Sequence, residues 1–115
     1  MAPDKDGFPL EVSEAFDFST DGPLDWEIDL IKRAVKNGRY LLTPHAQSRI
    51  IERGISASQV RQVILDGQAV SKDCPGNPIN RAPGLNFEGT INDGRTIRVK
   101  VIWQGRYMVV TAHEV

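Results

Sequence analysis

The sequence has a single cysteine, Cys74, and no long apolar run. One thiol cannot form an internal disulfide, which excludes a small secreted scaffold held together by disulfides. The apolar runs fall well short of the roughly 18 residues that span a bilayer, so no membrane partner is expected. The amino terminus also lacks the basic and apolar blocks of a signal peptide. We therefore expect a cytoplasmic protein, acting in the cell that makes it or in a target cell after delivery.

Histidine is also scarce, since the chain has only His45 and His113. Together with Cys74 they do not show the paired short spacing of a zinc site, and neither a metal nor another cofactor is expected. The glycines between Gly84 and Gly94 lack the spacing and the following helix of a phosphate-binding loop. Any chemistry is therefore expected to depend on the chain's own side chains.

Charge is distributed unevenly along the 115 residues, a length that corresponds to one domain. Residues 1–29 hold one lysine and nine acids, which gives 1 − 9 = −8, whereas residues 30–115 hold thirteen lysines and arginines and six acids, which gives 13 − 6 = +7. We predict an acidic irregular leader over residues 1–20 and a single domain over residues 21–115.

The basic body would attract polyanions such as RNA, and the acidic leader would compete with them for the same surface. We therefore predict that residues 1–29 screen a binding site or contact a neighbouring molecule. The alternative is a solvated acidic tail on an ordinary domain.

Three segments have the signals of helices: residues 21–38, 43–54 and 56–67. Thr43 and Ser56 are suitable caps, and Pro23 and Pro44 occupy early helical positions. Each segment ends at a glycine, which favours termination. Apolar residues recur at helical spacing in the first and third segments, which predicts helices that pack one face against a core.

The last thirty residues are typical of an antiparallel meander, because apolar residues alternate with period two around turns that contain glycine. A further short strand is expected over residues 69–72. The loop that follows, residues 74–84, has three prolines and two glycines. Together the elements predict an α+β fold with two or three helices packed on an antiparallel sheet.

The two turns of the meander determine which side chains share a face, since a slip of one residue moves every side chain to the other face. A three-residue loop over residues 92–94 pairs Phe87 with Val99 and places Glu88 beside Arg98. It also pairs Gly89 with Ile97 and Thr90 with Thr96. The predicted sheet face therefore gathers a carboxylate, a guanidinium and hydroxyl groups.

A two-residue turn at Gln104-Gly105 would define the last hairpin. It pairs Val101 with Met108 and places Arg98 opposite Thr111. The same register has three further consequences, which complete the pattern: Trp103 lies opposite Arg106, Thr96 lies opposite His113, and Met108, Val110 and Ala112 share the apolar face.

The strongest local signal is the segment from His45 to Gly54. His45, Arg49 and Arg53 are four residues apart, so at about 100° per residue they lie on one side of a helix. Such a stripe suits an anionic ligand, because arginine binds phosphate through two donors and histidine exchanges protons near neutral pH. The alternative is an exposed face on which Glu52 pairs with neighbouring arginines.

This segment and three others carry a resemblance to a known family. The motif His-Ala-x-x-Arg-x-x-Glu-Arg-Gly-Ile over residues 45–55 resembles that of a small bacterial domain family of undefined function, and the similarity covers about residues 40–115. The family looks like a relative of the barnase, EndoU, colicin and RelE-like superfamily of ribonuclease toxins. The other matching parts are Thr43-Pro44, residues 56–67 and Val109-Val110-Thr111.

The resemblance implies amino-terminal helices packed on a four-stranded antiparallel sheet, and a toxin that cleaves RNA without a metal ion. It also implies a cognate antitoxin or immunity protein as a partner. The catalytic residues vary between branches of the superfamily. Residue by residue, His45, Arg49 and Arg53 match the helix motif and Thr111 matches the late-strand position, and we predict these four as the catalytic group. The acidic leader and the net charge of −1 depart from the basic character of many ribosome-dependent toxins.

Metal-free cleavage of RNA needs a base for the ribose 2′-hydroxyl, an acid for the 5′-oxygen and cations around the phosphate. We predict that His45 is the principal acid or base, because the pKa of histidine, about 6.5, lies near working pH. Arg49 and Arg53 would clamp phosphate. The expected phosphate- and RNA-binding group, with candidates for the second proton role, is Arg98, Lys100, Tyr107, His113 and Glu88.

A non-catalytic module is the alternative function. Such a protein would use the same basic face to bind a protein or a nucleic acid and would leave it intact. The presence of His45 among the arginines favours chemistry, since arginines alone would suffice for binding.

Overall fold

The three expected helices are present in the computed structural model, which describes residues 15–76 and 82–115. Their bounds are Asp25–Lys36 for α2, Pro44–Glu52 for α3 and Ala57–Asp66 for α4. The predicted caps are confirmed, because the side chain of Thr43 accepts a bond from the Ala46 amide and that of Ser56 accepts one from the Gln59 amide. None of the helices in the described part of the chain is long and apolar enough to cross a membrane.

Five strands form one mixed sheet in the order β1-β5-β4-β3-β2. Their bounds are Tyr40–Leu42 for β1, Gln68–Asp73 for β2, Gly84–Thr90 for β3, Thr96–Trp103 for β4 and Tyr107–Glu114 for β5. The α+β class is therefore right, but the four-stranded antiparallel sheet is wrong. The additional strand, β1, is three residues long and pairs in parallel with β5 at the edge. A run this short shows no period in the sequence, and only its distant partner makes it a strand.

The register between β3 and β4 is confirmed. Phe87 pairs with Val99, Glu88 with Arg98 and Gly89 with Ile97. In the turn, the Ile91 amide donates to the Arg95 carbonyl, and Gly94 adopts a φ of 91°. A positive φ of this size favours glycine, which is why the three-residue loop could be predicted from the sequence.

The predicted register between β4 and β5 is wrong. Trp103 pairs with Tyr107 around a three-residue turn, and Val101 pairs with Val109. A bulge then leaves Val110 without a partner, so that Lys100 pairs with Thr111 and Arg98 with His113. Because a bulge places two residues of one strand against one of its neighbour, it interrupts the period of two. The buried residues of β5 are consequently Tyr107, Val109 and Ala112, in place of the expected set of Met108, Val110 and Ala112.

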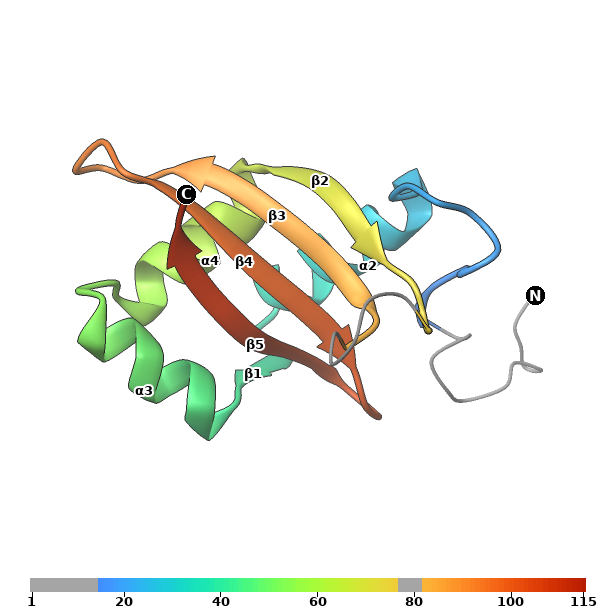
Figure 1. Ribbon diagram of the computed structural model, residues 1–115, viewed down its shortest axis with the longest axis horizontal. Helices are drawn as coiled ribbons and strands as arrows, with labels where there is room; N and C mark the ends of the chain where they lie inside the picture. The colour runs from blue at the N-terminus through green and yellow to red at the C-terminus, as the bar shows by residue number, and fades with distance from the viewer. Residues whose placement is uncertain (1–14, 77–81) are drawn as a thin grey trace.

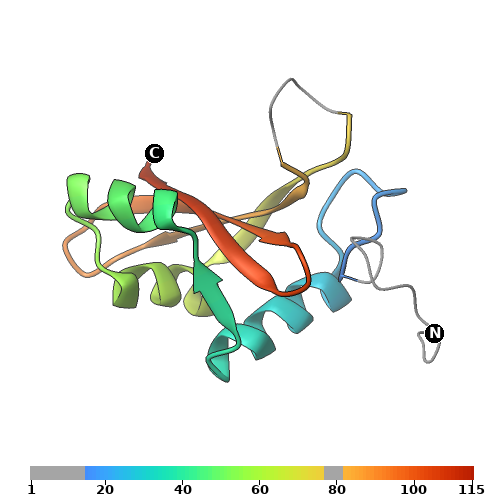
Figure 2. The same ribbon diagram turned by 90° about the horizontal axis from the view of Figure 1, so that it is seen from below.

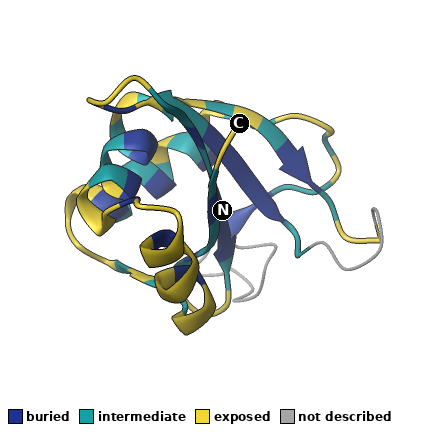
Figure 3. Ribbon diagram, turned by 60° about the vertical axis from the view of Figure 1, so that its left-hand side comes forward, coloured by how far each residue is buried: buried dark blue, intermediate teal, exposed yellow. Residues whose placement is uncertain are grey.

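The helices of residues 15–76 and 82–115 leave one face of the sheet open. Helix α4 packs against β3 and β4, α2 packs against α4, and α3 packs against β5. Figure 1 looks onto the uncovered side of the sheet, with α2 and α4 behind it, and Figure 2 shows these two helices together on the far side. The core lies between the sheet and α2 and α4, whereas the outer side of α3 is exposed (Figure 3). We call the uncovered side the open face.

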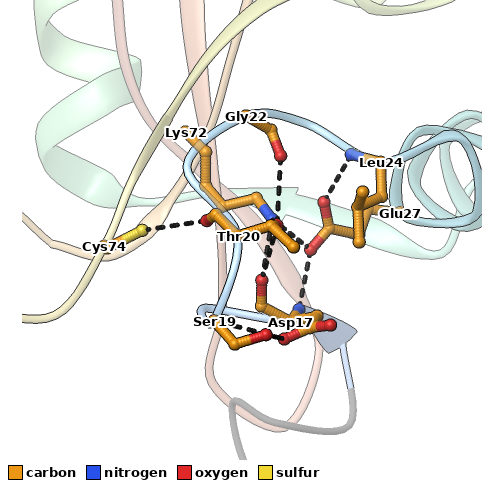
Figure 4. A network of polar contacts seen from close by, with 8 residues as sticks. All are labelled: Asp17, Ser19, Thr20, Gly22, Leu24, Glu27, Lys72 and Cys74. Carbon is orange, nitrogen blue, oxygen red and sulfur yellow. Dashed lines mark hydrogen bonds and ion pairs between the residues drawn. The ribbon is translucent and has the colours of Figure 1, made fainter.

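The described end of the acidic leader, residues 15–20, is packed against the domain. Ala15 and Phe16 are buried in the core. The carboxylate of Glu27 in α2 accepts bonds from the amides of Leu24 and Asp17, both at 2.7 Å, and pairs with Lys72 of β2 at 2.8 Å. Figure 4 shows this network, which fastens the leader to α2 and β2.

Candidate functional site

A row of three ionisable side chains crosses the open face from strand to strand. Glu88 of β3 is paired with Arg98 of β4, and Arg98 is paired with His113 of β5. Residues directly opposite each other on neighbouring strands have their Cβ atoms about 4.5–5.5 Å apart. A carboxylate, a guanidinium and an imidazole therefore lie side by side, although the sequence alone had placed Thr111 opposite Arg98.

The first two members of this row are joined by a double contact. Arg98 donates to Glu88 Oε2 through Nε at 2.7 Å and also through Nη2. Both side chains are partly exposed, with 40% of Arg98 and 25% of Glu88 accessible. The carboxylate thus fixes the guanidinium at the surface of the sheet, where a ligand can still reach it.

A second row lies next to the first, toward the β4–β5 hairpin. Asn86, Lys100 and Thr111 are paired across β3, β4 and β5. The ammonium of Lys100 lies 2.9 Å from Asp73 Oδ2, and the amide of Asn86 donates to the same oxygen at 3.1 Å. Lys100, Asp73 and Asn86 are all buried, so this network forms the floor of the site.

The electrostatic surroundings of His113 favour its neutral form. Burial is the main cause that lowers its pKa below the ordinary value of 6.5, followed by the positive charges of Arg53 and Arg98. The carboxylate of Glu88 acts in the opposite direction and raises the pKa. At neutral pH the imidazole therefore has a free nitrogen lone pair that can accept a proton.

Arg53, at the carboxyl end of α3, approaches β5 beside His113. Its Nη1 donates to the carbonyl of Ala112 at 2.7 Å. Ala112 follows the bulge at Val110 and is itself buried. The guanidinium therefore ties α3 to the part of β5 that carries the imidazole.

These rows border a cavity of about 450 Å³ on the open face. Four of the residues proposed from the sequence line it, namely Arg98, Lys100, Thr111 and His113. Glu88 does not line the cavity but is bonded to Arg98, which does. The remaining lining residues, which the sequence did not single out, are Ser71, Asp73, Ala82, Asn86 and Val110. Asp73 and Asn86 are buried polar residues in strands, and because this burial is seen only in the structure, no signal in the sequence identified them.

Three other candidates lie elsewhere. His45 is exposed at the start of α3, about 12 Å along the helix from Arg53 at 1.5 Å per residue, and it does not line the cavity. Arg49 is exposed and pairs with Glu52 at 3.4 Å. Tyr107 is only 7% exposed and packs its ring against Phe16 and Trp103. The helical stripe thus contributes one member, Arg53, to the site.

Among residues 15–76 and 82–115, no three histidine, cysteine, aspartate or glutamate side chains are grouped as a metal site. Comparison with protein families gives a match to the model described as "Domain of unknown function (DUF4258)" over residues 42–113. The match covers more than half of the chain, which therefore belongs to this family. It includes α3, α4 and all four antiparallel strands, and hence every residue of the two rows. Comparisons with curated proteins and with solved structures give no match.

Proposed function

We propose that this DUF4258 domain is a metal-independent ribonuclease of the toxin type. The observation that carries the proposal is the row Glu88–Arg98–His113 beside Lys100, because it combines a proton acceptor with cations in one accessible cavity. RNA cleavage by attack of the 2′-hydroxyl requires these groups and no bound cofactor. The resemblance to the barnase, EndoU, colicin and RelE-like superfamily, seen in the sequence, supports the same class of reaction.

In the proposed reaction, His113 removes the proton of the 2′-hydroxyl. The 2′-oxygen attacks phosphorus, the bond to the 5′-oxygen breaks, and a 2′,3′-cyclic phosphate forms. His113 replaces His45 in this role, because its imidazole lies in the cavity and its pKa is lowered. The carboxylate of Glu88 stabilises the imidazolium that forms.

The cations of the cavity act on the phosphate. Arg98 is held by Glu88 and presents a planar guanidinium, which suits the oxygens of a phosphate in the transition state. The ammonium of Lys100 adds positive charge from the floor of the cavity. The N–H groups of Arg98 and Lys100 are also placed to donate hydrogen bonds to the departing 5′-oxygen. Water supplies the proton that this oxygen takes up as it leaves, and the imidazolium of His113 returns its proton to water after the step.

The partners of the proposed enzyme are an RNA substrate and a neutralising protein. RNA follows from the chemistry of the cavity. A cognate antitoxin or immunity protein follows from the resemblance to toxins alone, and the structure adds no argument for it.

A binding module without catalysis is the second candidate. It is favoured by the pairing of each cavity cation with a carboxylate, Arg98 with Glu88 and Lys100 with Asp73. Such pairs also occur in polar networks that only stabilise a sheet. A module of this kind would bind RNA or a protein on the open face and leave it intact.

The two histidines of the chain provide a matched test. We expect His113→Ala to reduce cleavage of a short RNA by about 10²–10⁴-fold, the usual contribution of a general acid or base. His45→Ala removes the same side chain from an exposed helix start and should retain activity. Cleavage is measured with substoichiometric protein, and the products are examined for 2′,3′-cyclic phosphate ends.

The outcomes separate the candidates. Loss of activity in His45→Ala alone would return the principal role to the helix stripe. Full activity in both variants, or intact RNA with the wild type, would exclude the proposed mechanism. Inducible expression of the same three proteins, followed by sequencing of cellular RNA ends, would identify the RNA that is cleaved.

A further inference from the structure

A second concavity lies on the helix side of the sheet, away from the open face. It has a volume of about 390 Å³ and lies between α2 and the hairpin that joins β4 to β5. Figure 2 shows this hairpin beside α2. The hairpin contributes Trp103, Gly105, Arg106 and Tyr107, and the remaining lining residues are Leu30, Arg33, Ala34 and Arg39.

Two neighbouring grooves extend this concavity. One shares Arg33 with it and runs between α2 and α4, and the other shares Arg39 and Arg106 and runs past β1. Their combined lining contains six basic residues and one acid, Asp29, which gives 6 − 1 = +5. The six are Lys32, Arg33, Lys36, Arg39, Arg61 and Arg106. We call this surface the basic belt.

The arginines at the hairpin end of the belt are free to bind a ligand. Arg39 and Arg106 are exposed, and neither side chain has a hydrogen-bond or ion-pair partner among the described residues. Arg33 pairs with Asp29 on the surface of α2, where both side chains are 62% exposed. Exposed pairs of this kind are weak, so a phosphate can displace the carboxylate.

The floor between these arginines is aromatic and apolar. Trp103 packs edge-on against Tyr107, with ring centroids 4.9 Å apart and an interplanar angle of 68°. Its indole N–H is buried and has no hydrogen-bond partner in the described chain. An aromatic ring surrounded by guanidinium groups is the combination with which proteins bind single-stranded nucleic acids, because bases stack on the ring and phosphates pair with the cations.

We propose that α2 and the β4–β5 hairpin form a second site that binds single-stranded nucleic acid, with Trp103 as the stacking platform and Arg33, Arg39 and Arg106 as phosphate contacts. The proposal goes beyond the ribonuclease function, since binding at this site does not require cleavage on the open face. In a ribonuclease it would hold one part of a strand while another part occupies the cavity. An acidic protein segment would match the charge of the belt but would not use the aromatic floor.

The test uses a fluorescently labelled octamer of 2′-O-methyl uridine, which lacks a free 2′-hydroxyl and cannot be cleaved by the proposed reaction. Binding is measured by anisotropy over a range of salt concentrations. For single strands, the slope of log K against log salt is about −0.7 per phosphate contact. We expect Arg39→Gln with Arg106→Gln to weaken binding and to make the slope shallower by about 1.4. Gln104→Ala, on the same hairpin but outside the lining of these grooves, is the matched control and should behave as the wild type.

A second measurement reports on the aromatic floor. Trp26 is the other tryptophan of the chain and is 43% exposed, so Trp26→Phe leaves Trp103 as the single tryptophan, whose fluorescence can be excited selectively over that of the tyrosines. Quenching of this fluorescence by the octamer is expected, and polyglutamate of matched charge should give none. An unchanged salt slope in the double arginine variant would overturn the proposal. Equal binding of polyglutamate without quenching would overturn it in favour of an acidic protein partner.

Failure of this binding site can be distinguished from failure of the proposed ribonuclease function. The double arginine variant should still cleave a dinucleotide substrate, which is too short to reach both sites, whereas His113→Ala should still bind the octamer. Failure of cleavage with retained binding at the belt would reject the enzyme and keep this site.

Discussion

Two ion pairs of this domain have similar chemistry and very different surroundings. Glu27 and Lys72 are completely buried, with 0% of either side chain accessible, and the amides and oxygens of residues 17–24 complete their hydrogen bonds. Glu88 and Arg98 lie on the open face and are partly accessible, and Arg98 lines a cavity together with His113. The first pair links the leader, α2 and β2 and has a structural role. The second leaves donors at a surface that a ligand can reach.

The difference shows that an ion pair becomes a candidate for function only when its hydrogen-bonding capacity is not used up inside the fold. Lys72 donates to Asp17 O and Thr20 Oγ1, both at 2.8 Å, in addition to its contact with Glu27. All three of its donors are thereby used. Arg98 bonds one carboxylate oxygen of Glu88, which leaves part of its guanidinium available.

The largest effect is expected from breaking the buried pair. Lys72→Met would leave the Glu27 carboxylate buried without a counter-charge, which usually costs about 3–5 kcal/mol of folding free energy. Urea denaturation measures the loss. A variant within 1 kcal/mol of the wild type would show that water or another group compensates the carboxylate.

Breaking the Glu88–Arg98 pair of the open face should have a different effect. Glu88→Gln should change the free energy of unfolding by less than about 1 kcal/mol, as for other exposed pairs. Glu88→Gln should nevertheless lower the pKa of His113 further, because the Glu88 carboxylate of the wild-type protein raises that pKa. NMR titration of the imidazole measures the shift. A large loss of stability with no change in the pKa of His113 would assign this pair to the fold.

A variant of Arg53 should change the pKa of His113 in the opposite direction. Arg53→Gln removes a positive charge that lowers the pKa of His113, so the pKa should rise toward 6.5. Arg49→Gln is the matched control on the same side of α3, because Arg49 pairs with Glu52 and is not among the charges that shift the pKa of His113. Equal titration curves for the two variants would contradict the effect of the Arg53 charge on His113.

The dependence of stability on pH should follow from the same imidazole. The folded pKa of His113 lies below its unfolded value of about 6.5, so the unfolded chain takes up a proton first as pH falls. The stabilising contribution of neutral His113 is present above pH 6.5 and is lost as pH falls toward the folded pKa. His113→Gln should remove this part of the acid sensitivity, as measured by urea midpoints between pH 8 and pH 5. Parallel curves for the two proteins would contradict the lowered pKa.

The smallest effect is expected on the outside of α2. Asp29 and Arg33 form an i,i+4 pair in which both side chains are 62% exposed. Asp29→Ala should cost about 0.3–0.5 kcal/mol, and high salt should abolish the difference. A loss comparable to that of Lys72→Met would mean that exposure does not distinguish the pairs.

The uneven distribution of charge in the sequence predicted the role of the amino-terminal acids only in part. The nine acids of residues 1–29 predicted a role in screening a site. Of the acids in the described part, Glu27 forms a buried ion pair with Lys72, and Asp17 accepts hydrogen bonds from Ser19. Phe16 lies in the core, so deletion of residues 1–20 would test stability as much as screening. Asp4, Asp6, Glu11 and Glu14 lie outside the described residues, and neutralising them would isolate the effect of charge.

The candidate site was predictable in part. The β3–β4 loop required a glycine at a positive φ, and this local requirement was enough to place Glu88 beside Arg98. The position of His113 was not predictable, because the turn at Gly105 and the bulge at Val110 together shift β5 by two residues relative to the expected register. His45 matched a motif, but a helix stripe alone does not show which of its members face a cavity.

The sequence by itself determined the class of fold, the extents of α3 and α4 and the register of the β3–β4 hairpin, because caps, glycines and turn residues act on their immediate neighbours. Only the tertiary structure decided that Tyr40–Leu42 is a strand, that β5 bulges at Val110 and that His113 joins Arg98. These features depend on packing between residues that are far apart in the chain. Val109 and Ala112 both enter the core, and this burial outweighs the period of two that the strand would otherwise keep.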